Sequence, residues 1–472
     1  MLNVKKEFWI LLLLCIFLLS SIILIRTNYS SNLLIGSDSY KSLILASDIK
    51  NNNIGFFDNL IYSGNVLFEE YGWYFLLSFN PEFLAKYLPL LFGLLCFVLF
   101  YFILSEINPK LRNLASIILI MSPSFLYLFS VANKYIVSLF FILLGIFLFI
   151  KDKKAFSFIC FFLASLFSLF SIIFIILWFT YTGLRKQDYR YFFILFGLFL
   201  FSFIIQFFKL FQFGIPSLLF LKQFTLTTFL SSIILEFGSP HGLGFFMFVL
   251  GLIGIYHYFK TNYKYIFIYF LLIVVLLISF YIPYLLGYLS FIFAFFCAYA
   301  LDYFLHLEWK MNIFKFLTLL ILLCGFLFSF LVFYDNTTSF EPTPAYFEAI
   351  NYLKKQPNQD VVFADYYNGN YLLYSNKKTF IDENTLYDKE IKSKLNDFDS
   401  LLNSKNISLT ANTLNKYDVR YVLIDKKFKR DKFTNKEERF LFLIKYSPNV
   451  FAPIVINEEV ELWQVKNIGS SV

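Results

Sequence analysis

Long uninterrupted stretches of apolar residues, separated by short polar segments, make up most of the first two thirds of this chain. The first stretch covers residues 8–25, which would form a helix about 27 Å long, close to the thickness of the hydrocarbon core of a bilayer. It follows Lys5 and Lys6 and ends in Ile25-Arg26-Thr27, without the small-residue cleavage site of a signal peptide, so we expect a retained membrane span. Similar stretches predict further spans at residues 83–105, 111–131, 135–150, 191–208, 241–259, 264–281, 284–305 and 312–334.

The basic residues predict how these spans cross the membrane. Lysine and arginine concentrate in cytoplasmic loops, which places Lys5, Lys6 and the basic clusters near residues 110 and 151 on one side. The segment 155–183 is too long for one upright helix. The basic residues that follow it, Arg185, Lys186 and Arg190, lie on the cytoplasmic side only if this segment crosses the membrane twice, as two short helices. We therefore predict a polytopic α-helical bundle of about eleven spans. Three polar segments then lie on the exterior side, namely 26–82, 209–240 and 335–472.

The pattern changes abruptly after Tyr334 to a mixed, charged sequence in which Pro342 and Pro344 mark a linker. Helical and strand patterns alternate from there on, which favours an α/β domain. The predicted elements are helices at Ala345–Gln356 and Leu386–Asn403 and strands at Asp360–Ala364, Lys378–Ile381 and Val419–Ile424. The chain is thus predicted to have a membrane domain over 1–334, with exterior loops 26–82 and 209–240, and an exterior α/β domain over 335–472.

Composition excludes several classes of protein. With 59% hydrophobic and only 15% charged residues, and a mean hydropathy of +0.66, the first two thirds are predicted to lie in a lipid bilayer. The net charge of +8 is spread over short loops, so we expect no nucleic-acid partner. The five cysteines lie in apolar runs and the three histidines lie at the ends of different spans, a distribution that argues against disulfides and against a histidine or cysteine metal site.

Two acidic residues at the ends of predicted spans are the leading candidates for chemistry. Asp38 lies in the polar segment Gly36–Tyr40 after the first span, and Glu236 directly follows the apolar run of Ile233–Leu235. Carboxylates at the mouths of two spans can converge over a cleft and act as a general base or as ligands of a divalent cation. Other acids in the first loop, such as Asp48 and Asp58, have the sequence context of solvated loop residues.

Polar residues also follow two predicted strands of the α/β domain. Asp365–Asn370 comes directly after one strand, and Asp382–Thr385 after the next. Loops at the carboxyl ends of such strands often bind ligands, while ordinary turns use the same Asp, Asn and Gly residues. Both interpretations stay open from the residues alone.

The order of these features resembles the oligosaccharyltransferase catalytic-subunit family of the GT-C membrane glycosyltransferases. Gly36–Tyr40 is similar to the family's first-loop acidic motif, and Ile233–Glu236 with Gly242–Gly244 resembles its Thr-Ile-x-Glu loop and the helix after it. Asp365–Gly369 stands where the family has Trp-Trp-Asp-Tyr-Gly. Two further segments resemble the family's exterior domain, namely Lys378–Thr385 and Tyr417–Ile424.

The resemblance implies a GT-C fold and a set of site residues. Asp38 and Glu236 would be catalytic and would ligate Mg²⁺ or Mn²⁺. The implied substrate-binding residues are Tyr40, Asp365, Tyr367, Asn368 and Asp382.

The sequence also departs from the family at three places. The second acidic motif is replaced by Val131–Lys134, which contains no carboxylate, and Ala364 precedes Asp365 where the family has a tryptophan pair. The arginine that the family uses on the donor phosphate is absent near Tyr281–Tyr284, so that Lys222 or Arg26 would have to supply the positive charge. We therefore do not expect transfer of glycans to asparagine sequons.

These observations predict a membrane glycosyltransferase of the cell membrane. It would transfer a sugar or glycan from a polyprenyl-phosphate-linked donor to an exterior acceptor that the sequence does not specify, with Asp38 accepting the acceptor's proton. The alternative is a catalytically silent relative that binds lipid-linked glycans or scaffolds a glycan-assembly complex. A transporter is disfavoured because ionisable residues inside the spans are few and no pair of broken helices is evident.

Overall fold

The computed structural model describes residues 6–29, 33–52, 57–58, 65–66, 71–168, 170–186, 197, 225–263, 266–382, 391–433 and 439–466. The chain forms two compact units, each of which we describe by itself. The helical unit comprises Met1–Ser31, Glu70–Phe208 and Leu221–Phe340. The sheet unit comprises Asn32–Glu69, Lys209–Phe220 and Glu341–Val472.

The helical unit contains helices that match the longest predicted spans. Among the described residues, four helices are long and apolar enough to cross a membrane. They are α1 (Lys6–Tyr29), α4 (Pro81–Ile107), α14 (Leu285–His306) and α15 (Asn312–Asn336). The predicted helices at 8–25, 83–105, 284–305 and 312–334 are therefore confirmed as helices.

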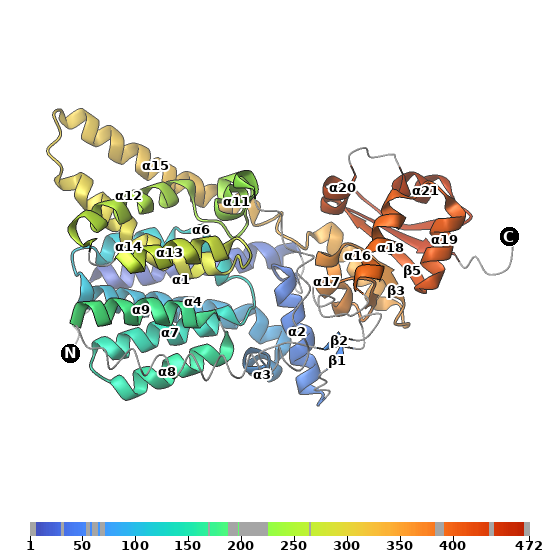
Figure 1. Ribbon diagram of the computed structural model, residues 1–472, viewed down its shortest axis with the longest axis horizontal. Coiled ribbons are helices and arrows are strands. Elements are labelled where there is room, and N and C mark those ends of the chain that lie inside the picture. Colours follow the sequence, from blue (N-terminus) through green and yellow to red (C-terminus); the bar gives the residue numbers. More distant parts are fainter. Residues whose placement is uncertain are drawn as a thin grey trace. The chain divides into compact units, whose positions relative to one another are not determined.

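Shorter apolar helices pack around them, and Figure 1 shows α4, α7, α8 and α9 running side by side. These helices are α7 (Tyr135–Ile150), α8 (Lys154–Phe167), α9 (Ser171–Lys186), α12 (Phe245–Thr261) and α13 (Ile266–Ser279). The predicted pair of short helices over 155–183 is present, because the chain is extended at Ser168 between α8 and α9. The number of about eleven crossings stays a prediction, and the predicted span at 191–208 lies outside the described residues.

The single helix predicted over 111–131 is wrong. The segment forms two short helices, α5 (Arg112–Ile120) and α6 (Pro123–Leu128). Pro123 is the cause, because proline has no N–H to continue the helix before it, whereas it is well accommodated in the first turn of the next one. The described residues of the unit also form short elements, namely α3 (Gly72–Ser78), α11 (Leu226–Ile233) and the 3-10 turn η2 (Leu235–Phe237).

Small residues set the closest approach between helices in this unit. A β-carbon on Gly254 of α12 would collide with the backbone of Phe296 in α14, so only glycine permits this crossing. Arg26, near the end of α1, is 2% exposed, and its Nη1 atom donates to the Phe340 carbonyl at 3.0 Å. A second contact of 3.4 Å reaches the Thr337 carbonyl, so Arg26 joins the end of α1 to the residues after α15.

The sheet unit is built on a mixed five-stranded sheet of order β4-β3-β5-β7-β6. The strands are β3 (Val361–Phe363), β4 (Lys378–Thr379), β5 (Val419–Asp425), β6 (Phe451–Ile456) and β7 (Val460–Val465). The central β3 is parallel to β4 and β5, and β7 is antiparallel to both β5 and β6. The three predicted strands are confirmed, whereas β6 and β7 were not predicted.

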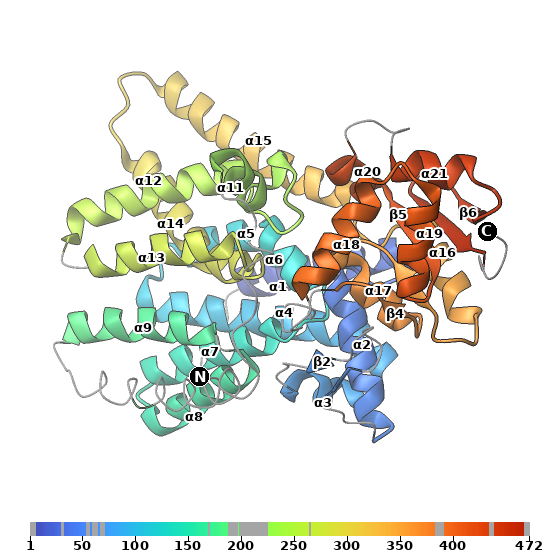
Figure 2. The same cartoon turned by 45° about the vertical axis from the view of Figure 1, so that its right-hand side comes forward.

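Helices cover this sheet, and Figure 2 shows α19 and α21 beside it. They are α16 (Pro344–Lys355), α17 (Gly369–Tyr374), α18 (Ile391–Asn403), α19 (Ile407–Lys416), α20 (Lys426–Lys432) and α21 (Phe440–Tyr446). The apolar faces of α18, α19, α20 and α21 share a core with the sheet, in which Phe363 stacks on Phe398 at 5.0 Å and meets Phe440 edge-on at 5.5 Å. This burial of apolar side chains stabilises the sheet unit.

A segment far away in the sequence also belongs to the sheet unit. Helix α2 (Ser37–Lys50) packs on α17, and the Gly36 N–H donates to the Glu341 carbonyl at 2.8 Å. The ring of Tyr40 lies 5.3 Å from that of Tyr371 and 5.0 Å from that of Tyr374. A short antiparallel pair, β1 (Phe57–Asp58) and β2 (Asn65–Val66), follows α2.

Candidate functional site

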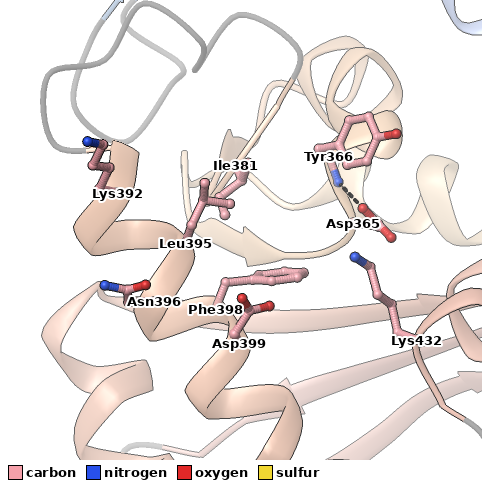
Figure 3. A pocket seen from close by; sticks show the side chains of 9 residues that line it. All are labelled: Asp365, Tyr366, Ile381, Lys392, Leu395, Asn396, Phe398, Asp399 and Lys432. Atoms are coloured by element: carbon pink, nitrogen blue, oxygen red, sulfur yellow. Dashed lines mark hydrogen bonds between the residues drawn. The ribbon is translucent and has the colours of Figure 1, made fainter. Parts of the chain in front are cut away.

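The sheet unit carries a pocket of about 490 Å³ at the carboxyl end of β3 (Figure 3). Ile381, Leu395 and Phe398 form its apolar part. Its polar lining is supplied by Asp365, Tyr366, Lys392, Asn396, Asp399 and Lys432. Two ammonium groups, two carboxylates, an amide and a phenol thus surround an apolar surface. Such a lining suits a neutral or zwitterionic polar ligand, since each donor and acceptor of the ligand can find a partner.

Asp365 is the most buried acid of this pocket. It follows β3 directly and is 2% exposed, and its Oδ1 atom accepts the Tyr366 N–H at 2.7 Å. Figure 3 shows the ammonium group of Lys432 directed toward this carboxylate. Burial raises the pKa of Asp365, while Lys432 and the Tyr366 N–H act in the opposite direction. Asp365 and Lys432 therefore provide an acceptor and a donor on one wall of the pocket.

Tyr367 and Asn368 belong to the same loop but turn toward another acid, Asp425. The Tyr367 hydroxyl donates to Asp425 Oδ1 and the Asn368 Nδ2 donates to Asp425 Oδ2, both at 2.6 Å. Asp425 Oδ1 also accepts the Phe428 N–H at 2.7 Å, and the Tyr346 hydroxyl donates to Asn368 Oδ1 at 2.9 Å. These hydrogen bonds hold the loop in place. The geometry therefore gives Tyr367 and Asn368 a structural role and not a position in the pocket.

The two polar loops predicted to carry the site do meet. A β-carbon on Gly369 would collide with the Cβ atom of Asp382, so glycine is required where the first loop crosses the second. Asp382 is 2% exposed and lies under this crossing. The juxtaposition of the loops after β3 and β4 follows from the parallel pairing of these two strands.

Asp38 lies in the first turn of α2, where Gly36 with a φ of 76° reverses the chain before the helix. The Asp38 side chain is half-buried. Tyr40, two residues on, is 0% exposed, and its hydroxyl accepts the Leu34 N–H at 3.1 Å. Tyr40 therefore packs in the core of the sheet unit and has no surface for a substrate.

Glu236 lies in η2 of the helical unit, and both of its carboxylate oxygens accept hydrogen bonds. Oε1 accepts from the Ser329 hydroxyl of α15, and Oε2 accepts the Phe245 N–H at 2.9 Å, at the start of α12. A carboxylate next to the N-terminus of a helix is favoured by the helix dipole. Glu236 thus joins η2, α12 and α15. Because Asp38 belongs to the sheet unit and Glu236 to the helical unit, their convergence over one cleft stays a prediction.

The residues at the position of the family's second acidic motif do not suit a divalent cation. Asn133 is buried, and its Oδ1 atom accepts the Tyr135 N–H at 3.0 Å while its Nδ2 atom donates to the Val131 carbonyl at 3.2 Å. The next residue, Lys134, is a cation. Within the described ranges, no group of three or more His, Cys, Asp or Glu side chains could hold a metal ion. The side chains of Val131–Lys134 therefore offer no carboxylate that could bind Mg²⁺ or Mn²⁺.

The sequence offered Arg26 and Lys222 as partners for a donor phosphate. Arg26 donates to backbone carbonyls inside the helical unit, which gives its guanidinium a structural function. Lys222 lies outside the described residues.

Comparisons with known proteins identify the architecture. Neither a scan of protein-family models nor a search of curated sequences gives a match. Among solved structures, the chain is similar to the oligosaccharyltransferase of the archaeon Archaeoglobus fulgidus in its apo form, with a TM-score of 0.59 and 13% identity over 89% of this chain and 70% of that protein. The chain has the oligosaccharyltransferase fold. The predicted resemblance to the oligosaccharyltransferase family is therefore confirmed at the level of the fold.

Two further structures from Archaeoglobus fulgidus share the oligosaccharyltransferase fold with this chain. One is that oligosaccharyltransferase in complex with zinc and sulfate, with a TM-score of 0.58 and 13% identity over 88% of this chain and 68% of that one. The other is the archaeal oligosaccharyltransferase AglB in complex with an inhibitory peptide and a dolichol-phosphate. Its TM-score is 0.50, with 12% identity over 87% of this chain and 69% of that one.

Three residues that shape these sites were not predicted, namely Asp425, Lys432 and Ser329. Asp425 could have been found, because an acid at the end of a predicted buried strand, followed by a helical pattern, is a typical helix N-cap. No local sequence pattern marks Lys432 or Ser329. Only the tertiary fold brings Lys432 next to Asp365 and Ser329 next to Glu236.

Proposed function

We propose that this chain is a membrane glycosyltransferase that transfers a sugar or glycan from a polyprenyl-phosphate-linked donor to an acceptor on the exterior face. The observation that carries the proposal is the oligosaccharyltransferase fold over 89% of the chain, with Asp38 retained in the first acidic motif. The apolar helices provide an environment in which a polyprenyl tail can dissolve.

In the proposed reaction Asp38 is the general base. Its carboxylate accepts the proton of the acceptor as the acceptor attacks the anomeric carbon of the donor sugar, and the bond from that carbon to the lipid phosphate breaks. The phosphate leaves as the anion. A positioned base of this kind contributes about 10² to 10⁴ in rate. Glu236 acts as a positioning residue, since its two hydrogen bonds fix the loop between η2 and α12.

The pocket beside Asp365 is proposed to hold the acceptor. Its volume of about 490 Å³ is within the usual range of small-ligand sites, and its charges balance. Asp365 and Lys432 can orient a hydroxyl or an amide of the acceptor by accepting and donating one hydrogen bond each.

The experiment that tests this function compares two acids of the same helix. The full chain is reconstituted in nanodiscs with a labelled polyprenyl-phosphate-linked glycan and an acceptor mixture, and release of the label from the lipid is measured. Asp38→Asn should lower turnover about 10²- to 10⁴-fold, whereas Asp48→Asn, also half-buried on α2, should keep it near the wild-type rate. Undiminished turnover of Asp38→Asn at equal abundance contradicts the assignment.

The alternative function is a catalytically silent protein that binds lipid-linked glycans. The turn around Asn133 favours it, because this turn lacks the acidic ligands that the family motif supplies. Binding of the donor without turnover, in the presence or absence of divalent cations, would establish the silent alternative.

A further inference from the structure

Asp365 and Lys432 present a hydrogen-bond acceptor and a donor on one wall of the pocket in Figure 3. Asp365 is 2% exposed, and its Oδ1 atom accepts the Tyr366 N–H at 2.7 Å. Within the described ranges, no group donates to its other carboxylate oxygen, Oδ2. The ammonium group of Lys432 is directed toward the carboxylate, and no hydrogen bond joins the two residues in Figure 3. A ligand in the pocket can therefore accept from Lys432 and donate to Asp365 at the same place.

This wall favours a neutral group over a charged one. A ligand ammonium at the wall would be attracted by Asp365 and repelled by Lys432, and a ligand carboxylate would be attracted by Lys432 and repelled by Asp365. Either charged group would also lose hydration on entering the pocket. A hydroxyl avoids these costs, because its single oxygen atom both donates and accepts hydrogen bonds. The wall therefore favours a ligand that carries a hydroxyl or another neutral polar group.

The pocket has an apolar centre. Ile381, Leu395 and Phe398 lie there, between the wall on one side and Lys392 on the other (Figure 3). A ligand that fills the volume of about 490 Å³ covers these side chains and removes their apolar surface from water. We therefore expect the part of the ligand above this centre to carry C–H groups and no charge.

Three polar residues of α18 form a rim around this centre, namely Lys392, Asn396 and Asp399. Their spacing places them on one face of the helix, and all three are exposed. In the part of the chain that the structure describes, their side chains form no hydrogen bonds with other protein groups. An ammonium group, an amide and a carboxylate are thus available to a ligand at the edge of the pocket.

A sugar residue matches this distribution of polar and apolar groups. A pyranose ring carries C–H bonds on its faces and hydroxyl groups around its edge, so that one face can pack on the apolar centre while the hydroxyls reach the wall and the rim. An asparagine side chain has one amide on one methylene group. It could bridge Asp365 and Lys432, but it would leave the rim without partners. A sugar therefore uses more of the polar groups of this pocket than an asparagine does.

We propose that this pocket binds a sugar residue of the acceptor, so that the acceptor of the transfer reaction is a carbohydrate. The proposal rests on the proposed function, because it gives the chemical class of the acceptor in that reaction. It assigns Asp365 and Lys432 to the recognition of one hydroxyl group and the rim of α18 to the recognition of others.

The first test measures binding to the full chain in nanodiscs, without a donor, by saturation-transfer NMR. The probes are the methyl glycosides of glucose, galactose, mannose and N-acetylglucosamine, and the capped tripeptide Asn-Ala-Thr. We expect at least one glycoside to bind about tenfold more tightly than the tripeptide, because it forms at least one hydrogen bond more. Lys432→Met and Asp365→Asn should each weaken the binding of this glycoside about tenfold, through the loss of one hydrogen bond.

The matched control is Lys426→Met. Lys426 begins the same helix, α20, and pairs with Glu459 at 3.4 Å, so its replacement removes the same charge without touching the pocket. The glycoside affinity of this variant should equal that of the wild type. Lys432 is exposed, so Lys432→Met should fold even if Asp365→Asn does not. The proposal is overturned if none of the four glycosides binds, if the tripeptide binds as tightly as the best of them, or if Lys432→Met leaves glycoside binding unchanged.

A second test separates this proposal from the proposed function. The wild-type protein receives the labelled polyprenyl-phosphate-linked glycan together with either the glycoside that binds or the tripeptide, and the label is followed into the product. Transfer to the glycoside supports both proposals. Transfer to the tripeptide alone overturns the carbohydrate acceptor and leaves the proposed function in place. If a glycoside binds and no label leaves the donor with either acceptor, the proposed function is overturned.

Discussion

Glu236 and Ser329 are hydrogen-bonded partners although 93 positions separate them in the chain. The serine hydroxyl of α15 donates to one carboxylate oxygen, and the Phe245 N–H of α12 donates to the other at 2.9 Å. The acid that sequence motifs mark as catalytic is therefore also a structural link between two helices.

Replacing Glu236 by alanine should lower the stability of the helical unit, because two donors lose their acceptor. The expected cost is about 1–3 kcal/mol, and Ser329→Ala, which removes only one of the two hydrogen bonds, should cost less. Thermal unfolding of the detergent-solubilised protein measures both. Glu308→Ala is the control, since Glu308 is exposed and its loss should change stability by less than about 0.5 kcal/mol. Equal losses for Glu236→Ala and Glu308→Ala would contradict the structural role.

Asp425→Ala should loosen the sheet unit. Asp425 is 6% exposed and accepts hydrogen bonds from Tyr367, Asn368 and the Phe428 N–H, so its removal leaves three donors without an acceptor. We expect a loss of about 3 kcal/mol, seen as faster hydrogen exchange in β5 and α20.

The control for this prediction lies six residues further on. Asp431 is exposed and pairs with Arg430, its exposed neighbour, so Asp431→Ala should leave the exchange rates of β5 unchanged. If the amide hydrogens of β5 exchange as slowly in Asp425→Ala as in the wild type, the three hydrogen bonds do not hold the loop that contains Tyr367 and Asn368.

Gly369→Ala should destabilise the sheet unit by about 1–3 kcal/mol, because the added methyl group collides with Asp382 and forces the two polar loops apart. Gly183→Ala in α9 is the control, and it should raise the stability instead of lowering it. A β-carbon there meets nothing within 4 Å, and alanine favours a helix over glycine by about 1 kcal/mol. Thermal unfolding that shows no loss for Gly369→Ala would mean that the loops can separate without cost.

The contribution of Asp397 to stability should depend on pH. Hydrogen bonds from Lys416 Nζ and the Tyr417 hydroxyl, each 2.6 Å long, lower the pKa of Asp397 below its ordinary value of 3.8. The ionised native form is favoured, so the stabilisation is complete above the pKa of the unfolded state and is lost as the pH falls through the lowered native pKa. Since the pair is partly exposed, we expect Asp397→Asn to cost only about 1 kcal/mol at pH 7.

Urea unfolding of the two proteins at a series of pH values measures this difference. The difference should shrink as the pH falls below 3.8 and disappear once the native carboxyl is protonated. A difference that stays constant with pH would show that Asp397 acts through packing and not through its charge.

The sequence predicted the helices and the parallel strands for different physical reasons. Long apolar runs such as 83–105 and 312–334 leave few alternatives to a helix, and buried strands such as Val419–Ile424 show a continuous run of β-favouring residues. Strands β6 and β7 escaped prediction because they form an edge hairpin whose exposed and buried positions do not alternate strictly.

The candidate site was predictable only in part. The loops after β3 and β4 were identified from their turn residues, and Gly369 and Asp382 do meet. The directions of the side chains were not predictable, because Tyr367 and Asn368 turn to Asp425, a partner 58 and 57 positions away. Long-range partners of this kind depend on the folded chain, for which local patterns carry no information.

The membership of α2 in the sheet unit has a consequence for biosynthesis. The helix that carries Asp38 is made more than three hundred residues before Tyr371 and Tyr374, whose rings contact Tyr40 of the same helix. Residues up to Tyr374 must therefore be made before this helix can dock, and the general base proposed here is not held in place until then. A nascent chain stalled before α17 would contain the helices that precede α17, but α2 would still lack the tyrosines on which it packs.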